Sequence, residues 1–315
     1  MDSALVLGST GFLGKEIVKK LVNKGFIVHG VDKVSSSQLK KHFEFIESDI
    51  SEFIKSKNYD LSEYKIIIDA ATVLPFKNNK KKLMDQNIQT ARHLVKSKFN
   101  EKVSIVYISS SGIYGIPKKV PIDLETPYSP LDYYGKSKLE AEKILKETIS
   151  ESCLSIIRPK AILGTERGGI FEIFFKLVKK NIPIPLPSYG MQIMQFVDVQ
   201  DVARLAIHLA ENKVSGIWPA AAPNPTTLGK YIESLEVSIK RKIRTLKLNS
   251  FLFQLIGNLL VNLKIINFTK WHFGGYSHSS FYDKNWKPDD FNYKYSSKET
   301  FFRTADYHLE FDRNL

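Results

Sequence analysis

The sequence predicts an α/β fold of the Rossmann-like type, with a doubly wound parallel sheet and a smaller C-terminal lobe. Two observations predict it. Short apolar runs alternate along residues 4–159 with stretches of helical pattern, as expected for a parallel sheet covered by helices. The first run leads into Gly8-Ser9-Thr10-Gly11-Phe12-Leu13-Gly14 and then into apolar residues at helical spacing. A strand, a glycine turn and a helix in this order present backbone N–H groups to a pyrophosphate.

The glycine turn lies between the apolar strand 4–7 and a helix whose apolar face spans residues 17–22. Gly8 permits the tight turn, Gly11 permits close approach of the phosphates, and Gly14 lets the helix pack against the strand. The spacing is G-x-x-G-x-x-G. With a strand before it and a helix after it, the turn predicts a dinucleotide site rather than a simple connector.

The second strand, 26–31, is followed by Asp32. A carboxylate at this position would take the ribose hydroxyls and repel a 2′-phosphate. We therefore expect NAD rather than NADP as the cofactor. Lys33, the next residue, is the one local feature that favours NADP.

Further strands are expected at 43–47, 66–69 and 103–108, and the ends of parallel strands gather at the ligand crevice. Asp49 follows the first of these strands, where it is placed either to reach an adenine amino group or to cap the next helix. Asn87 is expected to open a helix that packs on the sheet.

Residues 132–143 are expected to form a helix that carries Tyr134 and Lys138 one turn apart on the same face. A phenol with a pKa near ~10 is a poor base at neutral pH, and a neighbouring ammonium favours its ionised form. The pair is therefore a candidate proton-transfer device. Such spacing alone is more often a solvated lysine beside a surface tyrosine. The functional interpretation is supported by the hydroxyls of Ser109–Ser111, which precede the helix by about the length of one loop.

Beyond a sixth strand at 154–159, residues 170–178 predict a helix with an apolar face and 181–187 an extended segment. Residues 196–199 predict a return to the nucleotide-binding part. The stretch 250–268 predicts an amphipathic helix whose apolar runs fall below the roughly 18 residues of a membrane span. We expect this helix to line or cap the substrate pocket, with a polar stripe of Gln254, Asn258 and Asn262.

The composition fits a large core and a reducing compartment. The chain has 315 residues, enough for one α/β domain with an appended lobe. Cys153 is the only cysteine, which excludes an internal disulfide framework and a multi-cysteine zinc site. The first residues lead into an apolar strand without a basic or apolar signal region. We therefore expect a cytoplasmic protein without an export signal.

The net charge of +13 raises the question of nucleic-acid binding. Basic residues cluster only at 77–82 and 240–244, and neither cluster is interleaved with aromatic residues that would stack on bases. The seven histidines are dispersed, with no two at ligand spacing. We therefore expect neither nucleic-acid binding nor a metal site.

Taken together, these motifs resemble the extended short-chain dehydrogenase/reductases, in particular the NAD-dependent epimerase/dehydratase group. The match runs from residue 4 to about 205; beyond 220 it is limited to residues 225–227 and 285–288. The residues that carry the resemblance are Gly8-x-x-Gly11-x-x-Gly14, Asp32, Ser109-Ser110, Tyr114-Gly115, Tyr134-x-x-x-Lys138, Arg158-Pro159 and Phe196-Val197-Asp198-Val199-Gln200-Asp201-Val202-Ala203.

The resemblance implies a catalytic triad of Ser110, Tyr134 and Lys138. Ser110 would hold the substrate oxygen, Tyr134 would move its proton, and Lys138 would bind the nicotinamide ribose while favouring tyrosinate. The implied NAD-binding residues are Gly8, Thr10, Gly11, Phe12, Leu13, Gly14, Asp32, Asp49, Ile50, Ala70, Ala71, Asn87, Tyr134, Lys138 and Pro159.

The resemblance also implies a division of the chain. An NAD-binding Rossmann domain would span 1–165 and be completed by about 195–218, and a substrate-binding lobe would combine 166–194 with 219–315. The resemblance implies a small-molecule substrate, namely a nucleotide sugar, and a homodimer is one assembly that it allows.

Family chemistries differ in acids near the triad. In this family, dehydratases have an Asp-Glu pair after the hydroxyl residue, and decarboxylating members have a glutamate nearby. In this chain Ser111-Gly112-Ile113 follow Ser110, so neither acid is present. Simple hydride transfer remains, as in a nucleotide-sugar 4-epimerase. The alternatives are a reductase or dehydrogenase of a nucleotide sugar or hydroxysteroid-like alcohol, and a non-catalytic NAD(P)-binding protein.

Two expected diphosphate contacts are absent. Sugar-nucleotide epimerases usually have Asn where this chain has Ala161, and an arginine within the stretch that here reads Met191-Gln192-Ile193-Met194-Gln195. Lys160, Arg167 or Lys270 would have to replace them.

Overall fold

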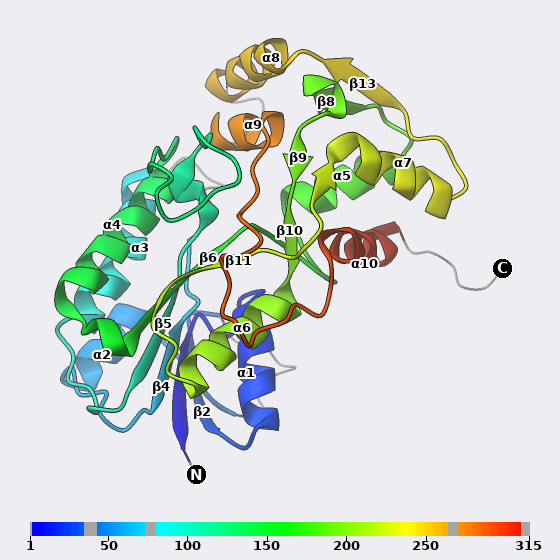
Figure 1. The fold of residues 1–315 in the computed structure, drawn as a ribbon. Helices are drawn as coiled ribbons and strands as arrows, with labels where there is room; N and C mark the ends of the chain where they lie inside the picture. Colours follow the sequence, from blue (N-terminus) through cyan, green and yellow to red (C-terminus); the bar gives the residue numbers. More distant parts are fainter. Residues whose placement is uncertain (1, 35–42, 74–79, 264–269, 310–315) are drawn as a thin grey trace.

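The computed structural model describes residues 2–34, 43–73, 80–263 and 270–309. Its centre is a seven-stranded sheet in the order β11-β6-β5-β4-β1-β2-β3, and every pairing in it is parallel (Figure 1). The strands are β1 (Ser3–Leu7), β2 (Ile27–Asp32), β3 (Glu44–Glu47), β4 (Ile66–Asp69), β5 (Ser104–Ile108), β6 (Leu154–Pro159) and β11 (Gly216–Ala220).

The strand order reverses direction at β1, because β2 pairs on one side of it and β4 on the other. In a doubly wound sheet the connections on the two sides of such a point diverge, which opens a crevice beyond the carboxyl ends of the strands. The strands read as apolar runs because helices cover both faces of the sheet. All four residues of β4 are buried, for example.

Two sets of helices cover the sheet (Figure 1). α1 (Gly14–Asn23) and α6 (Val199–Glu211) pack on one face, where Ile17, Val18 and Leu21 of α1 are buried. The other face is covered by α2 (Ile50–Ser56), α3 (Lys80–Leu94) and α4 (Tyr133–Thr148). The α1 side chains recur at three- and four-residue spacing, so one stripe of the helix meets the sheet.

The predicted α/β fold with a parallel sheet is confirmed, and the six expected strands are present within a residue at either end. The seventh strand, β11, was not predicted, because Pro219 lies within it. Proline donates no hydrogen bond, and β11 accommodates it as the edge strand of the sheet. One expectation was wrong: Asn87 does not open its helix, since α3 begins at Lys80. The Lys, Leu and Met residues before Asn87 are strong helix formers.

The remaining elements form a smaller lobe, visible in the upper right of Figure 1. Its core joins α5 (Ile170–Lys179), β8 (Ile184–Pro187), α7 (Leu228–Ser238) and α10 (Ser297–Leu309). In the described part of the chain, three short strand pairs lie outside the central sheet: β7 (Ala161–Leu163) with β10 (Phe196–Asp198), β9 (Ile193–Met194) with β12 (Thr226–Thr227), and β8 with β13 (Thr245–Leu248).

The predicted helix at 250–268 is present as α8 (Ser250–Asn262), which packs on α9 (Lys270–Ser277). Residues 264–269 lie outside the described part of the chain. No helix among the described residues combines the length and the apolar character that crossing a membrane requires.

Gly14 makes the tightest backbone approach in the glycine turn. A Cβ atom there would lie 1.9 Å from the carbonyl oxygen of Gly8, whereas a Cβ at the exposed Gly168 would meet no atom closer than 3.6 Å. We expect Gly14→Ala to lower the free energy of unfolding by about 1–3 kcal/mol through overpacking. Urea denaturation measures the change. Gly168→Ala is the matched control, and equal effects of the two changes would contradict the prediction.

Candidate active site

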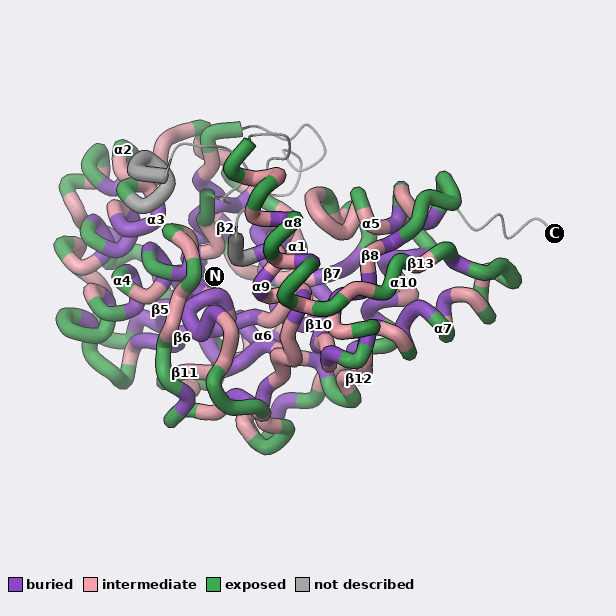
Figure 2. Tube along the Cα trace, turned by 90° about the horizontal axis from the view of Figure 1, so that it is seen from above, coloured by how far each residue is buried: buried purple, intermediate pink, exposed green. Residues whose placement is uncertain are grey.

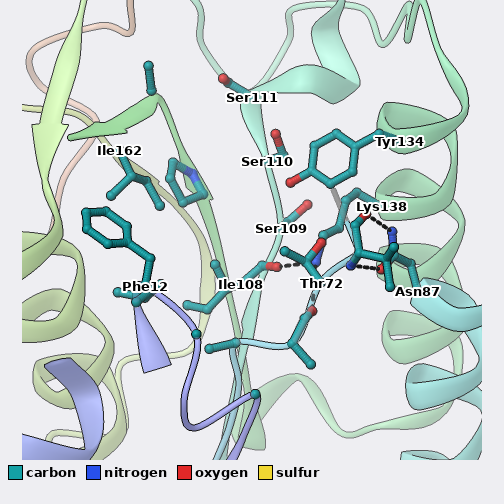
Figure 3. Close-up of a pocket in the computed structure, with 18 of the residues that line it drawn as sticks. Phe12, Thr72, Asn87, Ile108, Ser109, Ser110, Ser111, Tyr134, Lys138 and Ile162 are labelled. Carbon is teal, nitrogen blue, oxygen red and sulfur yellow. Dashed lines mark hydrogen bonds between the residues drawn. The ribbon is translucent and has the colours of Figure 1, made fainter. Parts of the chain in front are cut away.

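A pocket of about 1090 Å³ lies at the carboxyl edge of the sheet, between the sheet and the smaller lobe. The glycine turn and the ends of β2, β4 and β5 line it from one side, and Met194 and Tyr276 line it from the other. Figure 3 shows Tyr134, Lys138 and Ser110 facing this space, with Phe12 and Ile162 across from them. The pocket occupies the crevice that the reversal of strand order predicts.

The glycine turn brings backbone close to backbone. Gly8 has a φ of 78°, and a Cβ there would lie 2.7 Å from Cα of Ala71. The Gly8 N–H donates to the carbonyl of Val31 at 2.9 Å, which ties the turn to β2. Only glycine combines this positive φ with so close an approach. The turn therefore leaves a smooth backbone wall at the pocket.

Asp32 holds the turn through its side chain. One carboxylate oxygen accepts from the Thr10 N–H at 3.1 Å and the other from the Lys33 N–H at 2.7 Å. The Lys33 ammonium pairs with Asp49 at 2.6 Å. Because Asp49 already neutralises part of the Lys33 charge, Lys33 attracts a 2′-phosphate less than an unpaired lysine would. Lys33 therefore gives little support for NADP.

Asp49 caps α2, as one of the two alternatives predicted. Its Oδ1 accepts from the Ser51 N–H at 2.8 Å and from the Glu52 N–H at 3.4 Å. Burial disfavours its charged form, but the hydrogen bond and charge of Lys33 outweigh this and lower the Asp49 pKa. Asp49 also lines the pocket, so contact with an adenine stays a prediction.

α4 presents Tyr134 and Lys138 to the pocket. The helix begins after Asp132, whose carboxylate accepts from the Gly135 N–H at 2.9 Å. The Lys138 ammonium lies deep in the fold, where it donates to the Ile108 carbonyl at 2.8 Å and lies 4.8 Å from the centroid of the Tyr107 ring. The lysine is 2% exposed. It is therefore not the solvated surface lysine that the spacing alone more often indicates.

Burial moves the pKa values of this pair in opposite directions. It lowers the Lys138 pKa to about 8, against the charges of Asp69 and Glu142. It also raises the Tyr134 pKa, while hydrogen bonds from Ser110 and Thr72 and the charge of Arg167 act the other way. Both shifts disfavour the charged form of the group, so burial by itself does not favour tyrosinate at this position.

The three serines at the end of β5 have different partners. Ser109 donates to Glu142 inside the fold and is buried. The Ser110 hydroxyl accepts from the Gly112 N–H at 3.0 Å and faces the phenol of Tyr134 in Figure 3. Ser111 begins a short helical turn, η1 (Ser111–Tyr114), that lines the pocket rim. Of the three hydroxyls, Ser110 is the one placed beside Tyr134.

A buried ion pair fixes α4 against the sheet. The Arg158 guanidinium of β6 donates to both oxygens of Glu142, at 3.0 and 2.6 Å, and is 0% exposed. It also donates to the hydroxyls of Tyr114 at 2.6 Å and Tyr128 at 3.0 Å. Together with Ser109, these contacts connect β5, β6, η1 and α4 directly behind the pocket.

Two cations line the pocket near the smaller lobe. Lys160 Nζ donates to the Ser280 hydroxyl at 2.5 Å, and burial lowers its pKa to about 7. The Arg167 guanidinium lies 5.1 Å from the Phe12 ring centroid, and its Nε is buried without a hydrogen-bond partner. Burial lowers its pKa too. Neither side chain pairs with a carboxylate among the described residues, and the Lys270 side chain lies outside them.

The structure brings nearly all the predicted site residues to one pocket. Thr10 and Gly14 do not line it and instead support the glycine turn from behind. The predicted helix 250–268 was expected to line or cap the pocket, but none of its described residues, 250–263, lines it; α9 does so through His272, Gly275 and Tyr276. α8 packs on α9 through Phe253, which contacts Phe273 and Tyr276 of that helix. α8 is thus separated from the pocket by α9.

Three residues at the site were missed. Asp69 and Thr72 flank the end of β4, where polar residues after a buried strand were a usable signal. Glu142 lies one turn beyond Lys138, so the spacing that aligned Tyr134 with Lys138 also extends to it. Among the described residues, no three His, Cys, Asp or Glu side chains form a group that could hold a metal ion.

Comparison with known proteins adds the family. A model of the NAD dependent epimerase/dehydratase family matches residues 4–220. An uncharacterised Sinorhizobium fredii protein, y4nG, is 28% identical over 243 residues, which are 76% of this chain but only 60% of that protein. The UDP-glucose 4-epimerase of Vibrio cholerae is 23% identical over 285 residues, 84% of each chain. The structure of a Thermotoga maritima UDP-glucose 4-epimerase with UDP-glucose has a TM-score of 0.73 at 19% identity, covering 98% of this chain and 99% of that one.

The fold and the family match define an NAD-dependent enzyme of the Rossmann-like class. Because the family model covers more than half of the chain, the protein belongs to the NAD-dependent epimerase/dehydratase family, and NAD is its cofactor. The resemblance drawn from the sequence is confirmed. The residues present fit the cofactor, since the glycine turn offers bare backbone to a pyrophosphate and Asp32 lies at the end of β2.

The buried ion pair yields a stability prediction. Arg158→Met removes the cation and leaves Glu142 charged and 2% exposed, so we expect a loss of about 3–5 kcal/mol in unfolding free energy. Urea denaturation is the measurement. Lys143→Met is the matched control, because Lys143 pairs with Glu147 at 3.9 Å on the helix surface and should change stability by less than about 0.5 kcal/mol. A loss below about 1 kcal/mol for Arg158→Met would show that the pair does not hold the helix.

Proposed function

We propose that this protein is an NAD-dependent nucleotide-sugar 4-epimerase. The observation that carries the proposal is the meeting of Ser110, Tyr134 and Lys138 at one pocket wall, with no carboxylate in the residues that follow Ser110. Removing a hydride from a sugar carbinol needs an acid/base for the hydroxyl proton and a hydride acceptor. Elimination or decarboxylation would need a further acid that residues 111–113 do not supply.

Each member of the triad has a distinct task in this proposal. Bound NAD supplies the hydride acceptor and donor. Tyr134 would take the proton from the sugar hydroxyl as the carbinol is oxidised and would give a proton back when the carbinol forms again. Ser110 holds the sugar oxygen against the phenol, and Thr72 lies beside them as a second hydroxyl. When protonated, Lys138 would favour tyrosinate, and it would be the residue that hydrogen-bonds the nicotinamide ribose.

Lys160 and Arg167 hold the substrate diphosphate in this proposal. They line the same pocket, no described carboxylate neutralises them, and they compensate for Ala161 and for the missing arginine between residues 191 and 195. Charged hydrogen bonds of this kind are about twice as strong as neutral ones. A diphosphate at this position would place the attached sugar towards Tyr134, whose pKa Arg167 already influences.

The division of labour between the lobes follows from the same placement. We assign NAD binding to residues 1–165, completed by about 195–218, and substrate binding to 166–194 and 219–315. The support is that the glycine turn and Asp32 lie on the first part, while Met194, Tyr276 and Ser280 line the pocket from the second. A cytoplasmic location is supported by the single cysteine, Cys153. We also propose that the protein forms a homodimer, which analytical ultracentrifugation would test.

The test is epimerisation without net redox change. We expect the purified protein to carry NAD and to interconvert two epimers from a panel of UDP-, GDP- and dTDP-sugars, with no net absorbance at the reduced-nicotinamide band. Tyr134→Phe should lower kcat by at least about 10²-fold while NAD binding persists, because only the transferable proton is lost. The measurement is product chromatography together with calorimetric titration of NAD.

Tyr133→Phe is the matched control, since the neighbouring Tyr133 is exposed and has Ser137 four residues on instead of a lysine. It should keep nearly the full rate. If Tyr134→Phe retained most of the activity, the acid/base assignment would be wrong. If the wild type ignored all nucleotide sugars and reduced NAD with a hydroxysteroid, a net dehydrogenase of an apolar alcohol would replace the epimerase.

The Lys160 pKa of about 7 predicts a pH-dependent affinity. A free amine at this position cannot attract a diphosphate, so substrate affinity should fall as pH rises through about 7, by up to tenfold per unit. UDP-glucose is a suitable probe, because its diphosphate has no group that titrates between about pH 6 and 9. Calorimetric titration of the NAD-loaded protein across this range measures the effect.

Lys160→Met should bind UDP-glucose weakly and with no dependence on pH in this range. Lys230→Met, which removes an exposed lysine outside the pocket, is the control and should keep the wild-type profile. A pH dependence that survives in Lys160→Met would assign the titration to another group.

A further inference from the structure

The outward face of α8 is apolar. Six large apolar side chains on this helix or at its end are between 43% and 75% exposed. Their spacing of one, three or four residues places them on one side of the helix. Figure 1 shows α8 at the upper edge of the molecule, outside α9. We call this surface the α8 face; its members are Phe251, Leu252, Leu255, Ile256, Leu259 and Leu263.

The inward side of α8 carries two polar side chains, Gln254 and Asn258, whereas Asn262 at the end of the helix is exposed. Phe253 and Gly257 pack on the Phe273 ring of α9, and the two phenylalanine centroids are 5.4 Å apart. Gln254 is half-buried and donates to a backbone carbonyl one turn back at 3.3 Å. The Asn258 Oδ1 is buried and has no hydrogen-bond partner. A surface helix normally turns its polar side to water, so α8 is oriented the other way.

The sequence on either side of this helix carries charge of one sign. Between Glu236 and Asp283 the sequence contains no acidic residue and seven lysines or arginines. α8 itself is uncharged. Arg244 and Lys247 lie just before it, both are exposed, and no described residue forms an ion pair with either. An apolar face with cations beside it matches the chemistry of an anionic lipid surface, where headgroups attract the cations and acyl chains take the apolar side chains.

We propose that the α8 face docks on an anionic membrane surface, with the helix lying in the plane of the headgroups. A second copy of this chain is the less favoured occupant. A symmetric interface through this face would bring the same unpaired cations together with no acidic residue to meet them. The proposal does not depend on the reaction that the pocket performs.

Docking in this way would hold the pocket close to the membrane. α9 lies directly beneath α8 and lines the pocket through His272, Gly275 and Tyr276. Packed helices are spaced by about 8–10 Å, so one helix would separate the lipid surface from the pocket wall. No residue of α8 lines the pocket itself, which allows the surface to be changed without touching the site.

The experiment is vesicle co-sedimentation of the full-length, NAD-loaded protein. We expect binding to phosphatidylcholine vesicles that contain about 30% phosphatidylglycerol, at least tenfold weaker binding to phosphatidylcholine alone, and partial release by salt. Leu255→Gln with Leu259→Gln should weaken binding by at least about tenfold, because two acyl-chain contacts are lost. Lys247→Glu should weaken it by a similar factor and reduce the salt dependence.

The matched control is Leu124→Gln with Val237→Gln, two exposed apolar residues outside the α8 face. It should bind vesicles as the wild type does. All variants change exposed side chains, so their urea midpoints should equal that of the wild type. Absence of binding to anionic vesicles, or equal binding by the Leu255/Leu259 variant, would overturn the proposal. So would a dimer in light scattering that this variant alone dissociates, which would assign the face to a second copy.

Discussion

The geometry of the site depends on the buried ion pair between Arg158 and Glu142. A charge taken out of water is costly unless its partner meets it with well-oriented hydrogen bonds, and here the guanidinium donates to both carboxylate oxygens and to two tyrosines. The pair therefore tolerates little movement of α4 against β6. Since Glu142 lies on the same face of α4 as Tyr134 and Lys138, the ion pair that fixes the helix also fixes where the phenol and the ammonium stand.

Burial of the charged groups at this site also shifts their pKa values. Lys138 is held among carbonyls and the Tyr107 ring, with its pKa lowered to about 8, and Asp69 behind it has a pKa raised to about 6 by the same burial. Two groups whose pKa values move toward neutrality can exchange protonation states near physiological pH. The Tyr134 pKa responds to other neighbours: burial raises it, while hydrogen bonds from Ser110 and Thr72 and the charge of Arg167 lower it.

The pocket carries different charged groups at its two ends. Asp32, Asp49 and the Lys33 that pairs with Asp49 line the end beneath β2 and β3, while Lys160 and Arg167, which pair with no described carboxylate, line the end that faces the smaller lobe. Carboxylates suit ribose hydroxyls, and unpaired cations suit phosphate. The α8 face lies outside this arrangement, on the far side of α9.

The sheet, and the wall of the pocket that the sheet carries, could be predicted from the sequence. Apolar runs, the glycine turn and the spacing of Tyr134 and Lys138 are local signals, and each acts through neighbours a few residues away. The tertiary structure decided what depends on distant residues: which side of α8 is buried, that Lys33 pairs with Asp49, and that Glu142 meets Arg158. Side-chain partners across 16 residues or more leave no periodic trace in a single sequence, because only the folded sheet brings them together.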